Sequence, residues 1–239
     1  MQLYERYSKP RLEMVTRLDN QPLGEGVPSH GVVPIWLGEA SENVTLLESH
    51  VLLTDFGESF RPTETIRYKS HTPYILRPPE VFFLPSTPLS LSADIWGLAC
   101  AIFAILGQRP LFETWFPSNE RVIEEHVDTL GRLPSEWWTR WTNRDKIYNE
   151  QLERKDGSPR RPWATRFEYS IQEPRMRCGM VGIEKDEKAC LSALLLAMLA
   201  FKPEDRPSAQ QVLESDWMTK WALPDLDRAR CLEKLSRHG

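Results

Sequence analysis

Residues 92–107, which read SADIWGLACAIFAILG, form the most apolar stretch of the chain. Its side chains recur at the spacing of one helical face, namely Ile95, Leu98, Ala99, Ile102, Phe103 and Leu106. Trp96, Cys100 and Ile105 lie off that face, so the helix is apolar nearly all round. The stretch is too short to cross a bilayer. We therefore expect a buried helix at the centre of the fold.

Helix signals mark the ends of this stretch and the region that follows it. Ser92 has the residue type that caps a helix start, and Gly107 has the type that ends one. Residues 184–200 predict a second helix that ends before a proline. A third helix is predicted to begin at Ser208, because Gln211 completes an S-x-x-Q capping box.

Upstream of the central helix the sequence favours loops and short strands. Residues 1–49 are rich in proline and glycine, which shorten regular structure. Residues 51–54 are predicted to form a strand. Residues 32–37 are a second candidate, which Pro34 would confine to a sheet edge. The predicted fold class is therefore mainly α, with a few short strands near the N-terminus.

Composition places the chain among ordinary globular proteins. It has 239 residues, of which 41% are hydrophobic and 27% charged, and this excludes disordered and fibrous classes. Its formal net charge is -4, so the basic footprint of a general nucleic-acid binder is absent. We expect no direct nucleic-acid partner and no membrane partner.

Cysteine spacing and the N-terminal residues bear on location. The four cysteines are far apart and show no zinc-ligand spacing: Cys100, Cys178, Cys190 and Cys231. Such spacing fits separate reduced thiols. Residues 1–17 carry several charges and no apolar signal core. We expect a cytoplasmic or nuclear protein.

Two neighbouring segments carry opposite charge. Residues 113–136 hold six acids and two arginines, a balance of -4, whereas residues 140–166 hold eight basic residues and four acids, a balance of +4. Each run is interpreted first as a solvated surface. Trp137, Trp138 and Trp141 lie where the two segments meet and are expected to be core side chains, with a recognition cage as the alternative.

Four short motifs follow one another along the chain. Asp-Phe-Gly occupies 55–57, Arg-Pro-Pro-Glu 77–80, Asp-Ile-Trp 94–96 and Pro-Glu-Asp-Arg-Pro-Ser 203–208. Asp-Phe-Gly after an apolar run is a phosphoryl-transfer element in which the carboxylate holds Mg²⁺ against nucleotide phosphates. A single short motif can arise by chance. The four motifs in this order, however, resemble those of the C-terminal lobe of eukaryotic protein kinases. The resemblance implies such a lobe, built on the central buried helix.

The resemblance implies roles for particular residues. Asp55, Phe56 and Gly57 look like the cofactor-binding motif, with Asp55 as the magnesium ligand. ATP and Mg²⁺ are the implied cofactors, although we expect this chain alone to bind them weakly. Asp94 looks like the aspartate that fastens the central helix to the catalytic loop.

Other positions resemble the segment that holds the protein substrate. Thr72 and Arg77 match substrate-facing positions, and Glu80 matches the glutamate that closes this activation segment. The stretch from Thr72 to Glu80 is one residue longer than in typical Ser/Thr kinases, so the position of the substrate-facing threonine is open by one residue. Arg206 is implied to be the buried ion-pair partner of Glu80, and a buried charge needs such a partner.

Details within the motifs resemble the SR-protein kinase branch. Arg77 stands three residues before Glu80, and residues 94–96 lead through an Ala-Cys pair to Leu-Phe-Glu at 111–113. An acidic, tryptophan-rich insert follows. The resemblance covers residues 51–221 and implies transfer of the ATP γ-phosphoryl group to serine or threonine, in arginine- and serine-rich protein substrates.

The chain also departs from a complete kinase. Only 54 residues precede Asp55, and they contain no glycine-rich loop, no V-A-I-K-type lysine and no H-R-D loop. No catalytic base is present, so we expect the chain alone to be inactive. Residues 1–49 resemble an insert before the Asp-Phe-Gly strand, residues 50–222 the kinase lobe, and residues 223–239 a polar tail.

An alternative to catalysis is a docking role. A truncated, non-catalytic kinase could bind basic peptides through the acidic run that precedes the tryptophans. The four acids Glu120, Glu124, Glu125 and Asp128 are expected to form an exposed face on one helix. Binding at such a face would be weak and reduced by salt.

Overall fold

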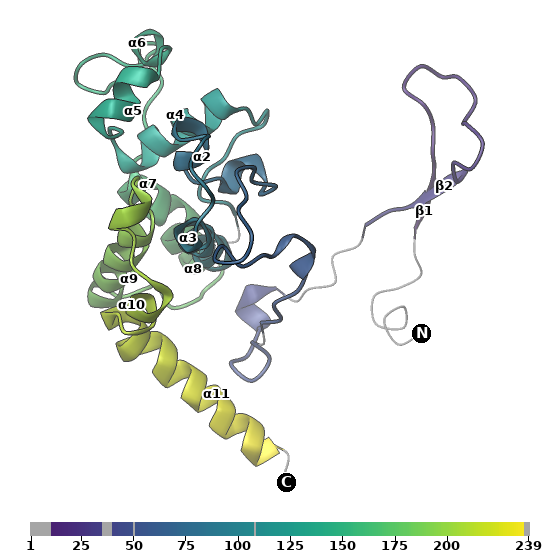
Figure 1. Cartoon of the computed structure of the whole chain (residues 1–239). Coiled ribbons are helices and arrows are strands. Elements are labelled where there is room, and N and C mark those ends of the chain that lie inside the picture. The colour runs from purple at the N-terminus through teal and green to yellow at the C-terminus, as the bar shows by residue number, and fades with distance from the viewer. Residues whose placement is uncertain (1–10, 35–39, 50, 108, 237–239) are drawn as a thin grey trace. The chain divides into compact units, whose positions relative to one another are not determined.

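A computed structural model of the whole chain describes residues 11–34, 40–49, 51–107 and 109–236. The chain divides into two compact units, Met1–Thr45 and Leu46–Gly239 (Figure 1). The first unit contains a two-stranded antiparallel sheet of β1 (Leu12–Met14) and β2 (His30–Val32), and the short 3-10 turn η1 (Ser41–Asn43). Of the predicted strand 32–37, Val32 ends β2, residues 33 and 34 are in no strand, and residues 35–37 lie outside the described residues.

The second unit is built from helices, so the mainly α fold is confirmed. In chain order its elements are η2 (Phe56–Glu58), η3 (Tyr74–Leu76), α2 (Glu80–Phe83), α3 (Leu91–Gly107), α4 (Asn119–Leu130), α5 (Ser135–Arg140), α6 (Arg144–Ile147), α7 (Trp163–Phe167), η4 (Glu168–Gln172), α8 (Glu173–Arg177), α9 (Lys185–Met198), η5 (Pro203–Asp205), α10 (Ala209–Leu213), η6 (Met218–Ala222) and α11 (Leu223–Ser236). No described helix is both long and apolar enough to span a membrane.

The predicted central helix is α3, and it begins one residue earlier than expected, at Leu91. Ser92 therefore lies inside its first turn instead of capping it. The buried side is narrower than predicted: Trp96, Ala99 and Phe103 are fully covered, whereas Leu98 is 43% and Ile105 67% exposed. The central buried helix is thus confirmed, although its side that carries Leu98 and Ile105 is exposed.

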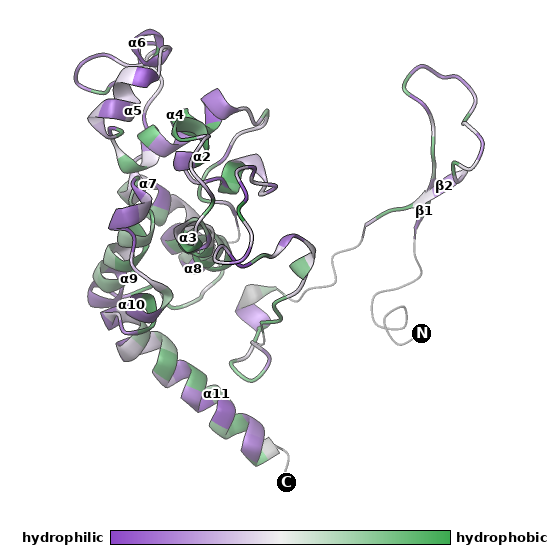
Figure 2. Ribbon diagram, viewed as in Figure 1, coloured by the Kyte–Doolittle hydropathy of each residue, from purple (hydrophilic) through white to green (hydrophobic). Residues whose placement is uncertain are grey.

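The main core joins α3 to α9. Leu191, Leu195 and Met198 of α9 lie against the buried side of α3, together with Phe167 and Ile171. Both helices are predominantly hydrophobic in Figure 2. Gly107 ends α3 where the chain passes close: a Cβ atom there would lie 3.0 Å from the Ser170 carbonyl oxygen, so a larger residue would not fit without movement.

A second core contains the tryptophan cluster. Trp137, Trp138 and Trp141 are buried, and the Trp137 ring stacks on Phe83 with 5.3 Å between centroids. These side chains pack with Ile123 and Val127 of α4 and with Tyr148, among others. The expectation that the tryptophans are core residues is confirmed.

Other predicted elements had different outcomes. The second helix, α9, lies within the predicted range 184–200, and α10 follows Ser208 with both hydrogen bonds of the capping box present. Residues 51–54 are not a strand, and Val51, Leu52 and Leu53 are 76–85% exposed. A strand needs a neighbour for its backbone groups, and no described segment pairs with these residues.

Candidate functional site

The candidate site lies along segment 55–80, between Asp55 and Glu80. Asp55 has φ 63° and ψ 59°, in the left-handed region that residues other than glycine seldom occupy. It directly precedes the 3-10 turn η2, whose end is fixed by the Ser59 hydroxyl donating to the Phe56 carbonyl oxygen at 2.7 Å. Backbone strain of this kind concentrates at functional sites. The site therefore begins at a residue held in an unfavourable conformation.

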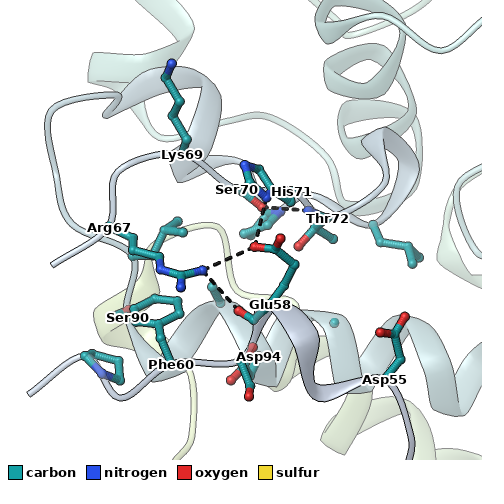
Figure 3. Close-up of a pocket in the computed structure, with 17 residues that line it drawn as sticks. Asp55, Glu58, Phe60, Arg67, Lys69, Ser70, His71, Thr72, Ser90 and Asp94 are labelled. Atoms are coloured by element: carbon teal, nitrogen blue, oxygen red, sulfur yellow. Dashed lines mark hydrogen bonds and ion pairs between the residues drawn. The ribbon is translucent and has the colours of Figure 1, made fainter. Parts of the chain in front are cut away.

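Segment 55–80 and the first turns of α3 enclose an open cavity of about 560 Å³. Asp55, Thr72 and Asp94 are among its lining residues, together with the basic side chains of Arg67 and Lys69 (Figure 3). The structure thus brings together the Asp-Phe-Gly motif, the predicted substrate segment and the start of α3.

Ion pairs shape the wall of this cavity. Glu58 accepts from the Arg67 guanidinium at 3.2 Å and lies 2.9 Å from His71 Nδ1. Arg67 also lies over the Phe60 ring, 4.8 Å from its centroid. Glu58 was not singled out in the sequence, because its partners lie 9 and 13 residues away and no local spacing connects them. These exposed contacts are individually weak, about 1 kcal/mol or less.

Arg77 and Thr72 are directly connected. Arg77 Nε donates to the Thr72 carbonyl oxygen at 2.7 Å, and the guanidinium lies over the Tyr74 ring at 4.1 Å. The half-buried turn η3 separates the two residues in the chain. Arg77 therefore fixes the backbone at Thr72.

Glu80 begins α2 and is held by Arg206 from the turn after η5. Nη1 of Arg206 donates to Glu80 Oε1 at 2.8 Å and Nη2 to Oε2 at 2.6 Å, a bidentate geometry. The Arg206 side chain is fully buried and that of Glu80 is 11% exposed. The pair joins residues 126 positions apart in the chain.

The other donors of Arg206 are also satisfied. They reach the carbonyl oxygens of Ser92, Ala200 and Phe201 at 2.8–3.0 Å. Its guanidinium carbon lies 5.1 Å from the Trp96 ring centroid. Arg206 therefore ties α2, α3 and the end of α9 together beneath the cavity.

Asp94 lies in the first turn of α3, exposed at the cavity wall. No hydrogen bond or ion pair joins its carboxylate to another of the residues that the structure describes. The given sequence before Asp55 contains no H-R-D motif.

Of the ligands implied for ATP and Mg²⁺, the described residues place the Asp55 carboxylate at the cavity. Magnesium uses one or two protein carboxylates and completes its shell with phosphates and water. Asp55 offers one carboxylate, and it lies apart from Glu58 and Asp94 in Figure 3. Among the described residues no group of three or more His, Cys, Asp and Glu side chains is placed to hold a metal.

The acidic residues of α4 do not form the exposed face predicted from the sequence. Glu124 and Asp128 are only 6% and 5% exposed. Arg154 bridges them, with Nη2 3.0 Å from Glu124 Oε2 and Nη1 2.7 Å from Asp128 Oδ2. The Tyr148 hydroxyl donates to Asp128 Oδ1 at 2.7 Å, and burial together with this bond raises the pKa of Tyr148 above its usual range.

The remaining acids of this run are paired as well. Glu125 lies 2.9 Å from Arg166 Nη1, and Arg166 is only 3% exposed. Glu120 accepts from the indole N–H of Trp141 at 2.6 Å. The acidic and basic segments therefore neutralise each other inside the fold. Counting charge separately for each segment does not reveal these pairs, because the partners lie 26 to 41 residues apart.

His126 is buried, although from the sequence alone it is interpreted as a surface or hydrogen-bonded histidine. Neither of its ring nitrogens has a hydrogen-bond partner among the described residues. The rings of Phe112 and Trp96 lie 4.6 and 4.9 Å away. Burial, reinforced by the positive charges of Arg206 and Arg166, lowers the pKa of His126 to about 3. The signal was its place on the apolar face of α4, beside Val122 and Val127.

Comparison with known proteins agrees with this geometry. Residues 41–218 match the protein kinase domain family. A serine/threonine-protein kinase SRPK of Physarum polycephalum is 28% identical over 129 residues, which cover 52% of this chain and 29% of the relative.

Two further relatives are also kinases. A probable serine/threonine-protein kinase dyrk2 of Dictyostelium discoideum is 27% identical over 191 residues, 77% of this chain and 19% of the relative. The mitogen-activated protein kinase 9 of Arabidopsis thaliana is 30% identical over 161 residues, 64% of this chain and 25% of the relative. The chain spans less than a third of the length of each of the three relatives.

Proposed function

Because this chain belongs to the protein kinase domain family, we propose that it forms the substrate-holding part of a protein serine/threonine kinase and does not transfer phosphate alone. The observation that carries this proposal is the Glu80–Arg206 pair, which fastens one end of segment 55–80 to the helical core. With Arg77 bound to the Thr72 carbonyl, it gives the segment a fixed shape beside the cavity. A fixed surface of this kind is what positioning a protein substrate requires.

The proposal that the chain alone does not transfer phosphate depends on which reactive groups it contains. Phosphoryl transfer needs a base that orients the hydroxyl nucleophile, cations that neutralise the phosphates, and close positioning of both reactants. Of these parts the chain supplies the Asp55 carboxylate. We propose that it lacks the nucleotide lobe and the catalytic loop, and the exposed apolar residues Val51, Leu52 and Leu53 support this.

Arginine- and serine-rich proteins are the proposed substrates. The SRPK relative supports this class. Within the cavity, the carboxylates of Asp55 and Asp94 offer negative charge that a guanidinium can approach. The acids of α4 are not counted toward this role, since arginines of the chain itself bind them. We propose residues 50–222 as the kinase lobe and a cytoplasmic or nuclear location.

Complementation tests this function. The purified chain with ATP, Mg²⁺ and an arginine-serine repeat peptide should incorporate no phosphate. Adding a separately purified nucleotide lobe with catalytic loop, taken from the Physarum polycephalum relative, should produce transfer above the level of that fragment alone. Asp55→Asn should abolish the gain, whereas Asp216→Asn on an exposed surface pair should keep it. Transfer by the chain alone, lost on Asp55→Asn, would refute the inactive half of the proposal.

A further inference from the structure

An exposed turn at residues 156–159 joins two anchored parts of the basic segment. Ser158 stands in this turn, and both its backbone N–H and its hydroxyl donate to Asp156 Oδ1, at 2.9 and 2.6 Å. Gly157 has φ 76°, which lets the chain reverse here. The Ser158 side chain is therefore accessible, but its conformation depends on a neighbouring carboxylate.

Arginines anchor the chain on both sides of the turn. Before it, Arg154 holds Glu124 and Asp128 of α4, as described above. After it, Arg160 Nη2 donates to the Val127 carbonyl oxygen at 2.9 Å, and its Nε lies 3.7 Å from Asp128 Oδ1. The two arginines therefore clamp the turn onto one end of α4 through a shared carboxylate.

Basic residues lie on both sides of Ser158 in the sequence. Residues 154–161 read RKDGSPRR, with four cations within four residues of the serine and Asp156 as the single acid. Arg154 Nε lies 3.7 Å from Asp156 Oδ1, and no hydrogen bond satisfies this N–H. Phosphorylation of Ser158 would therefore place a dianion at hydrogen-bond distance from the Asp156 carboxylate. The neighbouring arginines are already bound to the carboxylates of α4.

We propose that Ser158 is a phosphorylation site whose modification opens this turn and loosens the arginine clamp on α4. The modifying enzyme is a protein serine/threonine kinase that accepts serine followed by proline and arginines, and its second substrate is ATP. A bond forms between Ser158 Oγ and the γ-phosphorus, the bond from that phosphorus to the β,γ-bridging oxygen breaks, and ADP leaves. The hydroxyl proton passes to the base of the modifying kinase. This proposal does not rest on the function proposed above.

Electrostatics gives the modification its effect. A phosphoserine carries a charge of about -1.5 to -2 at neutral pH. It cannot donate to Asp156 as the hydroxyl does, so the bond at 2.6 Å becomes a repulsion. Its three oxygens attract Arg154 and Arg160 and compete with Asp128 for them. The repulsion displaces the turn from Asp156, and the competition weakens the bonds of the two arginines to Asp128.

The first measurement is site occupancy. The full chain is incubated with ATP and a purified proline-directed kinase, and phosphate is located by peptide mass spectrometry. Thr87, which is exposed and followed by Pro88 but has no cation within four residues, is the matched internal control. We expect at least about tenfold more phosphate on Ser158 than on Thr87 at early times, and Ser158→Ala should lose it. Equal labelling of the two sites, or none on Ser158, would overturn the assignment.

The second measurement is amide hydrogen exchange of the phosphorylated chain. Amides of residues 153–161 should exchange about tenfold faster than in the unmodified chain, while those of α9 stay unchanged. Asp156→Asn removes the repelling carboxylate, so phosphorylation of that variant should accelerate exchange less. Phosphate on Ser158 that leaves exchange at 153–161 unchanged would show that the turn is not a switch.

Discussion

The two ends of segment 55–80 contrast in almost every physical respect. Asp55 is exposed, has a strained backbone, and its carboxylate has no described hydrogen-bond donor. Glu80 is buried and accepts two hydrogen bonds from an arginine that comes from 126 residues away. One end is therefore fixed by the chain's own core, and the other end is prepared for partners that the described residues do not include. Within this one segment, the residue that contributes to stability, Glu80, is therefore at the opposite end from the residue proposed to act in phosphoryl transfer, Asp55.

The largest expected effect is at the fixed end. Arg206→Ala leaves the Glu80 carboxylate buried without its partner and removes three further bonds to carbonyl oxygens. The free energy of unfolding should fall by about 3 to 5 kcal/mol, which lowers the melting temperature by about 10 °C in a domain of this size. Thermal denaturation followed by circular dichroism measures it.

Arg228→Ala is the matched control, because Arg228 makes an exposed ion pair with Asp225 on α11. It should leave the melting temperature within about 1 °C of the unmodified chain. A melting temperature for Arg206→Ala that equals the control value would mean that Glu80 is not locked by this pair.

The next effect concerns the clamp on α4. Arg154→Ala should cost about 2 to 3 kcal/mol, less than Arg206→Ala because the Arg154 side chain keeps 13% exposure. Asp128→Asn together with Arg154→Ala should cost less than the sum of the single changes, since each removes the other's partner. Urea denaturation of the two single variants and the double variant gives the coupling. Strict additivity would contradict direct pairing.

A pH-dependent effect of about 2 kcal/mol is expected from His126. Its pKa is about 3 in the folded chain and about 6.5 when unfolded. Below pH 6.5 the unfolded state binds a proton that the folded state refuses, so stability is full above that pH and falls toward pH 3. At pH 5 the loss is about 2 kcal/mol.

His126→Leu should remove this part of the acid sensitivity, because leucine does not titrate. The variant should match the unmodified chain or exceed it at pH 7, since two unsatisfied buried nitrogens disappear. Unfolding free energies at pH 7 and pH 5 test the difference. An identical pH dependence in both chains would place His126 in contact with water or with another acceptor.

The parts of the molecule differ in how far their structure can be predicted from the sequence. The helix α3 follows from apolar spacing, which is a local signal, whereas the Glu80–Arg206 contact is implied by the resemblance to protein kinases. The pairing of Arg154 with Glu124 and Asp128 follows from neither, because it depends on how the loop after α5 folds back onto α4. Residues 51–54 have strand-forming side chains but lack a neighbour, and a sequence window contains no information about neighbours. Local structure was predictable from the sequence, whereas pairing between segments was predictable only where the family resemblance supplied it.

The smallest expected change in the free energy of unfolding is at Asp55. Its left-handed backbone costs about 1 to 2 kcal/mol for a residue with a Cβ atom, and glycine removes this cost while losing about 0.5 to 1 kcal/mol of chain entropy. Asp55→Gly should therefore raise the free energy of unfolding by about 0.5 kcal/mol, whereas β-branched Asp55→Val should lower it. Urea denaturation resolves the sign of both changes.

In the complementation assay Asp55→Gly should nevertheless abolish transfer, because the carboxylate is gone. If Asp55→Gly is more stable than the unmodified chain and yet inactive, then the aspartate lowers stability and is required for transfer. Such a loss of stability is expected at a residue with a chemical role. A lower stability for Asp55→Gly would mean instead that the Asp55 carboxylate contributes to holding segment 55–80.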